Sequence, residues 1–229
     1  MTALRMLNDM AVPGRRAPSL MVLLPGALQT PETLIDEGMV AAVRARRLAL
    51  DLALVDPGLA TIDEATDGSV AQRLETLLLP ARQQYRSLWL AGISLGGFMA
   101  LAHAARHPGR VDGMLLLAPY PGNRLLTGAI DAAGGPARWA TTAAVNAADD
   151  EENAWRWLAR NGRAGSAPEL HFAHADADRF AAGQRLMAQT LPPARVELIA
   201  GGHDWPSWRT LWNNFLDRNG GRFDGHPDA

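Results

Sequence analysis

The sequence predicts an α/β fold built on a mostly parallel sheet. Short apolar runs alternate along the chain with longer segments whose apolar residues recur at helical spacing. This alternation is typical of parallel strands joined by crossover helices. The 229 residues are enough for one substantial core. We therefore expect a single domain over residues 1–229.

Six apolar runs are expected to form the sheet. The first, Ser19 to Leu24, has the nearly continuous apolar character of a strand that is buried on both faces. The other five each end near a glycine, a proline, an aspartate or a small residue, as strands followed by turns do. They are Leu48 to Val55, Ser87 to Gly92, Val111 to Ala118, Glu169 to Ala173 and Arg195 to Ala200.

Helical segments are expected between these runs, covering both faces of the sheet. They are Pro31 to Arg46, Val70 to Tyr85, Leu95 to His107, Arg179 to Leu191 and Pro206 to Leu216. The interval from Tyr120 to Ala167 is too long for one strand and one helix. It holds an Ala/Gly-rich stretch followed by Asp149 to Arg160, which opens with acidic residues and has a helical pattern. We expect residues 120–167 to be an insertion over the sheet edge.

The composition excludes several classes of protein. The chain is 48% hydrophobic with a formal net charge of -2, which is typical of globular proteins and argues against a nucleic-acid partner. The absence of cysteine excludes disulfides, thiolate metal sites and a cysteine nucleophile. Charged residues interrupt the N-terminal apolar residues, and no apolar run is long enough for a bilayer span. We expect a cytoplasmic protein.

The most informative segment is residues 88–99. Here an apolar strand runs into Gly92-Ile93-Ser94-Leu95-Gly96-Gly97 and then directly into a helix. This is the G-x-S-x-G pattern in the strand-turn-helix setting of a nucleophilic serine. Side chains two positions before and after Ser94 would collide across the sharp turn, which explains Gly92 and Gly96. The backbone N–H of Leu95 would lie at a helix N-terminus, where it can stabilise an oxyanion.

Ser94 is thus the predicted nucleophile and Leu95 one predicted oxyanion donor. The alternative for this segment is a glycine-rich turn used only for close packing of helix and sheet.

His203 is the predicted general base. It follows the expected strand Arg195 to Ala200, in a loop rich in glycine. Because the carboxyl ends of parallel strands share one edge of a sheet, this loop and Ser94 are expected at the same edge. The alternative is a loop histidine held by Asp204. The remaining histidines lie in or at the end of a helix, beside a strand or in the C-terminal tail: His103, His107, His171, His174 and His226.

The residue that orients the base should follow a strand between Ser94 and His203. Asp176 and Asp178 both follow the expected strand that begins at Glu169. Asp178 is preferred because Arg179 starts the next helical pattern, so that Asp178 lies at the strand-helix turn. Its alternative role is a helix N-cap, worth about 1 kcal/mol.

With Ser94, an acid near residue 178 and His203 in this order, the chain resembles the α/β-hydrolase superfamily over nearly its whole length. The segment from Gly92 to Gly97 and the loop from Gly201 to Pro206 look like small bacterial carboxylesterases, including siderophore-ester and esterase D-like enzymes. The resemblance implies hydrolysis of a small-molecule carboxylic ester through an acyl-enzyme intermediate, with no metal or organic cofactor. A thioesterase is the alternative. A non-catalytic binding protein of the same fold is the alternative from another class.

The resemblance also implies a second oxyanion donor. In the family the loop after the first core strand often reads His-Gly-x, and the third residue donates its backbone N–H. Here the loop reads Leu24-Pro25-Gly26-Ala27-Leu28, so Ala27 is the implied donor and Leu28 the fallback. About 18 residues precede the first core strand. This is too few for the usual leading pair of strands and indicates a trimmed core.

A family insertion in the position of residues 120–167 commonly forms a lid over the acyl pocket. Its tryptophans, Trp139, Trp155 and Trp157, either line that pocket or pack the insertion onto the sheet. Near the C-terminus, Trp205 is a candidate for the pocket wall. The helical spacing of Trp208 and Trp212 favours core packing. The oligomeric state is not predicted.

Overall fold

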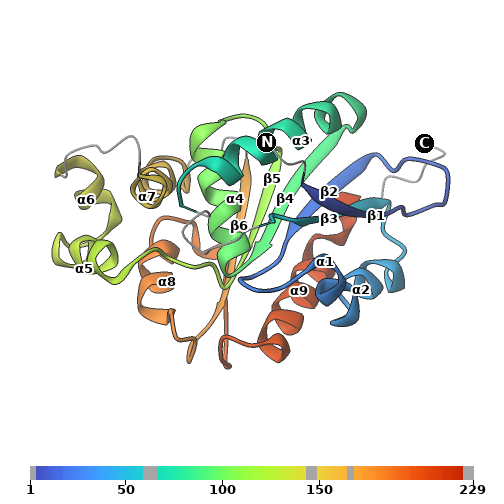
Figure 1. Ribbon diagram of the computed structural model, residues 1–229. Coiled ribbons are helices and arrows are strands. Elements are labelled where there is room, and N and C mark those ends of the chain that lie inside the picture. Colours follow the sequence, from blue (N-terminus) through green and yellow to red (C-terminus); the bar gives the residue numbers. More distant parts are fainter. Residues whose placement is uncertain (1–3, 59–65, 143–148, 164–167, 224–229) are drawn as a thin grey trace.

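A seven-stranded sheet forms the centre of the computed structural model, which describes residues 4–58, 66–142, 149–163 and 168–223 (Figure 1). The strand order is β1-β3-β2-β4-β5-β6-β7, and all neighbours except β1 and β3 pair in parallel. The prediction of an α/β-hydrolase fold is confirmed. The strands are β1 Arg5–Asp9, β2 Ser19–Leu24, β3 Leu50–Asp56, β4 Ser87–Ile93, β5 Gly113–Leu117, β6 Glu169–Ala175 and β7 Val196–Ile199.

The strand β1 is the one that the sequence did not predict. It pairs antiparallel with β3 at the sheet edge, where Arg5 lies opposite Asp56, and none of its residues is buried. Its sequence begins with Arg5 and ends with Asn8 and Asp9, which leaves no apolar run long enough to predict a strand. Among the described residues, β1 is the one strand that precedes β2.

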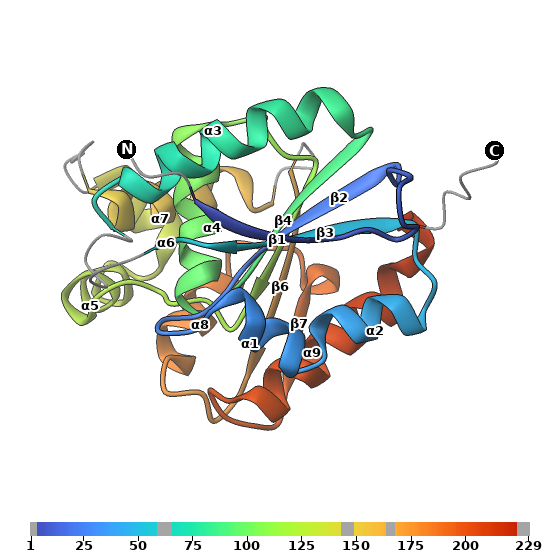
Figure 2. The same ribbon diagram turned by 45° about the vertical axis from the view of Figure 1, so that its right-hand side comes forward.

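Helices cover both faces of the sheet (Figure 2). On one face lie α1, α2 and α9, whose apolar side chains form one buried cluster with Met21 and Leu23 of β2. On the other lie α3 and α4, in a second cluster with Leu20 and Val22. The alternation along β2 is the period-two pattern of a strand buried on both sides. The bounds are α1 Pro31–Asp36, α2 Met39–Ala45, α3 Ser69–Gln84, α4 Leu95–Arg106 and α9 Trp205–Asn219.

The expectation of one continuous helix from Pro31 to Arg46 was wrong. The segment forms two helices, α1 and α2, separated at Gly38, whose φ of 81° lies in the left-handed region. A glycine adopts this conformation without the steric cost that other residues have, and it ends a helix.

Three helices lie between β5 and β6 and gather together on the left in Figure 1: α5 Arg124–Ala132, α6 Pro136–Thr142 and α7 Asp150–Asn161. The helix α7 packs against α4, and Trp155 is buried there with its indole N–H donating to the Pro121 carbonyl at 2.7 Å. Trp155 and the buried Trp139 thus pack the insertion onto the rest of the fold. Residues 143–148 and 164–167 of the expected insertion lie outside the described residues, as does His226.

The remaining elements are α8 Ala181–Ala188, which follows β6, and two short 3₁₀ segments, Pro193–Arg195 before β7 and Gly220–Phe223 after α9. In the described part of the chain, no helix combines the length and the apolar character needed to cross a bilayer.

Candidate active site

Ser94 lies on the turn between β4 and α4. Its backbone has φ 52° and ψ -115°, a region that non-glycine residues rarely occupy. Its N–H donates to the Leu117 carbonyl at 2.9 Å, and its carbonyl accepts from Phe98 and Tyr120. These bonds to β5, α4 and the following loop hold the strained turn. The serine is 5% exposed.

The glycines around Ser94 allow two close approaches of backbone. A Cβ on Gly92 would lie 2.2 Å from the carbonyl carbon of Gly96, which is the expected collision across the turn. A Cβ on Gly96 would instead lie 2.3 Å from the Leu24 carbonyl oxygen, at the end of β2. Gly96 therefore brings the loop after β2 close to Ser94, a role that the sequence pattern did not reveal.

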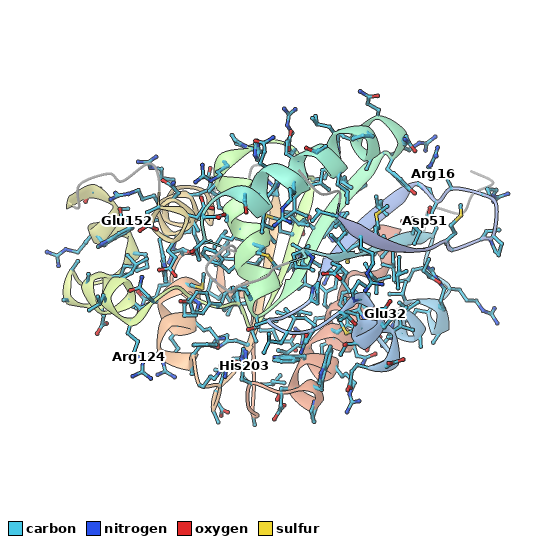
Figure 3. All side chains as sticks on the ribbon, in the orientation of Figure 1. Arg16, Glu32, Asp51, Arg124, Glu152 and His203 are labelled. Carbon is cyan, nitrogen blue, oxygen red and sulfur yellow. The ribbon has the colours of Figure 1, made fainter. Side chains whose placement is uncertain are left out.

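His203 lies between Ser94 and Asp178. Its Nε2 is 2.9 Å from Ser94 Oγ and its Nδ1 is 2.7 Å from Asp178 Oδ2. An ionised carboxylate can only accept, so Nδ1 carries the proton and Nε2 accepts from the Ser94 hydroxyl. The side chains of His203 and Asp178 are 6% and 0% exposed. Figure 3 shows His203 at the lower edge of the molecule, beyond the carboxyl ends of the strands.

Asp178 has further hydrogen bonds that favour its charged form. Its Oδ1 accepts from the Phe180 N–H at 2.7 Å, and its Oδ2 accepts from Gln184 Nε2 at 3.2 Å. Burial alone would raise the pKa of the Asp178 carboxyl, but the hydrogen bonds from His203, Phe180 and Gln184 outweigh it, and the pKa lies below its usual value. Asp178 is thus an anion at neutral pH.

Asp176 does not contact His203. It is exposed, and its Oδ1 accepts from the Gly201 N–H at 3.2 Å. The backbone N–H of Asp176 donates to the Ile199 carbonyl at 2.9 Å. Of the two candidate aspartates, Asp178 forms the hydrogen bond with the imidazole. Asp176 instead joins the loop after β6 to the loop after β7.

Gln184 was not among the residues singled out in the sequence. It is fully buried on α8, and its amide also donates to the Pro119 carbonyl at 3.2 Å. It therefore connects Asp178 to the loop that follows β5. No local pattern indicates this contact, because Asp178 precedes α8 and residues six apart do not face each other on a helix.

Aromatic rings fix the orientation of the His203 imidazole. Phe180 and Trp208 both lie edge-on to it, with ring centroids 5.1 and 5.0 Å away. Trp205 packs on Trp208 at 5.1 Å rather than on the imidazole. Trp212 is buried and donates to the Met39 carbonyl at 3.0 Å, in agreement with the core packing expected for it.

The two predicted oxyanion donors flank Ser94. Leu95 is the first residue of α4, and a Cβ on Gly26 would lie 3.6 Å from Ser94 Cβ, which puts the loop carrying Ala27 beside the serine. Among the described residues, neither the Leu95 nor the Ala27 N–H has a hydrogen-bond acceptor. Leu28, the fallback, has φ 60° and a side chain 97% exposed.

Comparison with known families agrees with this geometry. The family model described as "Putative esterase" matches residues 63–216, which is more than half of the chain. The chain belongs to this esterase family. It is a carboxylic-ester hydrolase of the α/β-hydrolase type, as the resemblance implied. No curated protein sequence matches the chain.

Solved structures share the fold of this esterase. A ferulic acid esterase has 15% identity and a TM-score of 0.65, with 97% of this chain and 99% of that chain covered. S-formylglutathione hydrolase from Agrobacterium tumefaciens has 15% identity and a TM-score of 0.63, covering 96% and 90%. Paleococcus ferrophilus monoacylglycerol lipase has 12% identity and a TM-score of 0.61, covering 96% and 99%.

Proposed function

We propose that this esterase cleaves its substrate through an acyl-enzyme intermediate on Ser94, with His203 as general base and Asp178 as the acid that orients it. The observation that carries the proposal is the unbroken hydrogen-bond chain from Ser94 Oγ through His203 to Asp178. This is the arrangement that nucleophilic catalysis by serine requires.

In the acylation step, Ser94 Oγ forms a bond to the carbonyl carbon of the ester while its proton moves to His203 Nε2. The Asp178 carboxylate stabilises the imidazolium and holds its tautomer. The carbonyl oxygen becomes an oxyanion, which we assign to the N–H groups of Leu95 and Ala27. Both flank the serine, and neither has an acceptor among the described residues. His203 then returns the proton to the leaving alkoxide, and water releases the acyl group by the same steps.

A thioester substrate is the second candidate. The chain shares its fold with an S-formylglutathione hydrolase, whose name places the formyl group on sulfur. Oxygen esters and thioesters with the same acyl group, compared by kcat/KM, separate the two candidates, since discrimination between substrates is contained in that ratio.

Labelling with a fluorophosphonate tests the proposal. We expect the wild-type protein to react and Ser94→Ala to stay unlabelled, while Ser69→Ala, at the start of α3, reacts like the wild type. If the wild-type protein is neither labelled nor active on a series of activated esters, the proposed catalytic mechanism is wrong and a non-catalytic binding protein is favoured.

The setting of the enzyme is also part of the proposal. We infer a single α/β-hydrolase domain with residues 120–167 as its lid, a small-molecule substrate, no nucleic-acid partner and a cytoplasmic location. The modest net charge of -2 and the scattered arginines support the absence of a polyanionic partner.

A further inference from the structure

A groove of about 750 Å³ lies beside the proposed catalytic residues. It runs between α8 and the segment from Tyr120 into α5. Two of its wall residues touch the catalytic chain: the Tyr120 N–H donates to the Ser94 carbonyl at 2.9 Å, and the Phe180 ring lies 5.1 Å from that of His203. The two rings also pack on each other, with centroids 5.5 Å apart. The groove therefore has two wall residues in contact with Ser94 and His203.

Arginines dominate the charge of this groove. Arg124, Arg179 and Arg185 line it and are exposed, and Asp131 is the one acidic residue among its lining residues. Within the described ranges, none of the three arginines has an ion pair, and Arg179 has only the face of the Phe180 ring, 4.7 Å from its guanidinium carbon. An excess of positive charge thus faces the groove.

The position of Arg124 adds to this argument. It is the first residue of α5, a helix of nine residues. The helix dipole disfavours a cation in the first turn and favours an anion. Arg124 therefore adds positive charge where the helix dipole is already positive, and no carboxylate lies in the first turn of α5 to offset it.

The nearest buried carboxylates are already committed to other donors. Glu151 accepts from the Tyr120 hydroxyl at 3.1 Å and from the backbone N–H of Asn123 at 3.0 Å, and it also accepts from the Asn123 side chain. Asp178 is held by His203. Glu151 therefore supports the groove wall through Tyr120 and Asn123 and, among the described residues, forms no ion pair with the three arginines.

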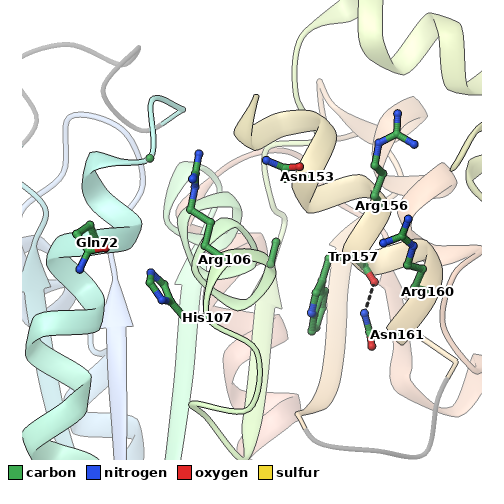
Figure 4. Close-up of a pocket in the computed structure, with 10 residues that line it drawn as sticks. Gln72, Arg106, His107, Asn153, Arg156, Trp157, Arg160 and Asn161 are labelled. Atoms are coloured by element: carbon green, nitrogen blue, oxygen red, sulfur yellow. Dashed lines mark hydrogen bonds between the residues drawn. The ribbon is translucent and has the colours of Figure 1, made fainter. Parts of the chain in front are cut away.

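In a second arginine-rich pocket, two arginines have structural partners that the arginines of the groove lack. This cavity of about 470 Å³ lies between α3, the end of α4 and α7 (Figure 4). There Arg106 forms an ion pair with the buried Asp150, while Arg156 lies 3.4 Å from Glu152 and stacks over Trp139. The Arg106 ion pair and the Arg156 stacking contact hold α7 to α4 and α6. Arg160, the third arginine of this pocket, is exposed and has no ion pair among the described residues. In the groove, none of the three arginines joins two helices through an ion pair in the described part of the chain.

We propose that the groove binds a carboxylate or phosphate group of the substrate, so that the preferred substrates are esters carrying a negative charge away from the scissile bond. This inference rests on the proposed function. Guanidinium groups form paired, charge-assisted hydrogen bonds to both kinds of anion. The rings of Tyr120 and Phe180 form the apolar wall for the carbon chain between the ester and the anion.

Matched ester pairs test the inference. 4-Acetoxybenzoate against its methyl ester puts the charge on the leaving group, and monomethyl glutarate against methyl pentanoate puts it on the acyl group. After correction for spontaneous hydrolysis, we expect one pair to show about a tenfold higher kcat/KM for the anionic member, since charge-assisted contacts are the stronger ones. This preference should fall as salt rises, because salt screens exposed charges.

The variant that removes the three charges together, Arg124→Gln with Arg179→Gln and Arg185→Gln, should lower the ratio of anionic to neutral kcat/KM about tenfold. Arg86→Gln is the matched control. Arg86 is exposed just before β4, at the end of that strand opposite Ser94, and its loss should leave the ratio unchanged. A ratio near one in the wild type, or one that the triple variant does not lower, overturns the inference. Melting temperatures check that each variant is folded.

Binding to Ser94→Ala separates this inference from the proposed function. Calorimetry should show tighter binding of 4-acetoxybenzoate or monomethyl glutarate than of its neutral partner, and the three substitutions should abolish the difference. Arginine-dependent binding without any hydrolysis by the wild type would reject the proposed function and keep the anion site. Hydrolysis of all four esters without charge preference would keep the proposed function and reject the anion site.

Discussion

The side chains of His203 and His103 are 6% and 0% exposed, and both are hydrogen-bonded to a carboxylate. His203 Nδ1 lies 2.7 Å from Asp178, and His103 Nε2 lies 3.0 Å from Glu75. They differ in what surrounds the second nitrogen. The Nε2 of His203 faces the Ser94 hydroxyl, whereas the Nδ1 of His103 is buried without a partner among the described residues.

Their places in the fold explain this difference. His103 is on α4 and Glu75 on α3, so their contact joins two helices that cover one face of the sheet. Glu75 also pairs with Arg110 at 2.7 Å. His203 is on a loop at the carboxyl edge of the sheet, where a ligand can approach. A buried histidine-carboxylate pair becomes a candidate for catalysis only when the other ring nitrogen meets a reactive group at an accessible edge.

The largest expected effect comes from replacing each histidine. His203→Gln should lower kcat by about 10⁴- to 10⁶-fold, as removal of the base does in other serine hydrolases. His103→Gln should keep kcat within about threefold of the wild type, because it contacts no reacting atom. Steady-state hydrolysis of an activated ester measures both. A large loss of kcat in a folded His103→Gln variant would contradict the distinction between a catalytic and a structural histidine.

The second prediction compares the two aspartates near the histidine, Asp178 and Asp176. Asp178→Asn should lower kcat about 10⁴-fold, because the amide cannot hold the imidazole in the tautomer that accepts the serine proton. Asp176→Asn should change kcat less than about fivefold, since its single exposed hydrogen bond to Gly201 is weak. The ratio of the two rates is the measurement. An equal loss in both variants would argue that Asp176 shares the role.

The third prediction concerns stability against pH. Burial lowers the pKa of His103 to about 4, although Glu75 opposes this effect and His107 and Arg110 add to it. Between the unfolded pKa and this value, the unfolded chain binds a proton that the folded protein does not. Stability should therefore fall as pH drops from about 7 to about 4, by up to ~3 kcal/mol from this group.

Urea unfolding at about pH 7.5 and pH 5 measures how much the free energy of unfolding falls with pH. His103→Gln should be less stable at neutral pH but should show a smaller loss on acidification, by ~2 kcal/mol at pH 5. An equally steep loss in the variant and the wild type would show that other groups produce it.

The smallest expected effect is that of Gln184, which positions the acid. Gln184→Leu removes the hydrogen bond to Asp178 and should lower kcat about tenfold, the usual value of one charged hydrogen bond, with little change in KM. The pKa of the Asp178 carboxyl should rise in this variant, since that bond lowers it, and an NMR titration of the carboxyl measures the change. Gln83→Leu, exposed on α3, is the control. A change in KM alone would contradict a positioning role.

Local patterns account for what could be predicted. Five of the six predicted strands are largely buried and consist of short apolar runs. The sixth, β7, has no buried residue and was predicted from its apolar residues alone. Ser94 was found because its strained turn needs glycines at fixed spacing, and His203 because its loop follows a strand at the same edge. The edge strand β1 and the break at Gly38 escaped because neither depends on an apolar run.

The sequence by itself determined the fold class and the candidate nucleophile and base, since backbone strain and strand burial restrict which residues can occupy those positions. Only the tertiary structure decided which aspartate meets His203, because Asp176 and Asp178 are two residues apart and both follow β6. It also decided that Gln184 supports the acid and that three arginines from α5 and α8 share one groove. These contacts join segments whose relative position follows from the packing of the whole core, and no local pattern encodes it.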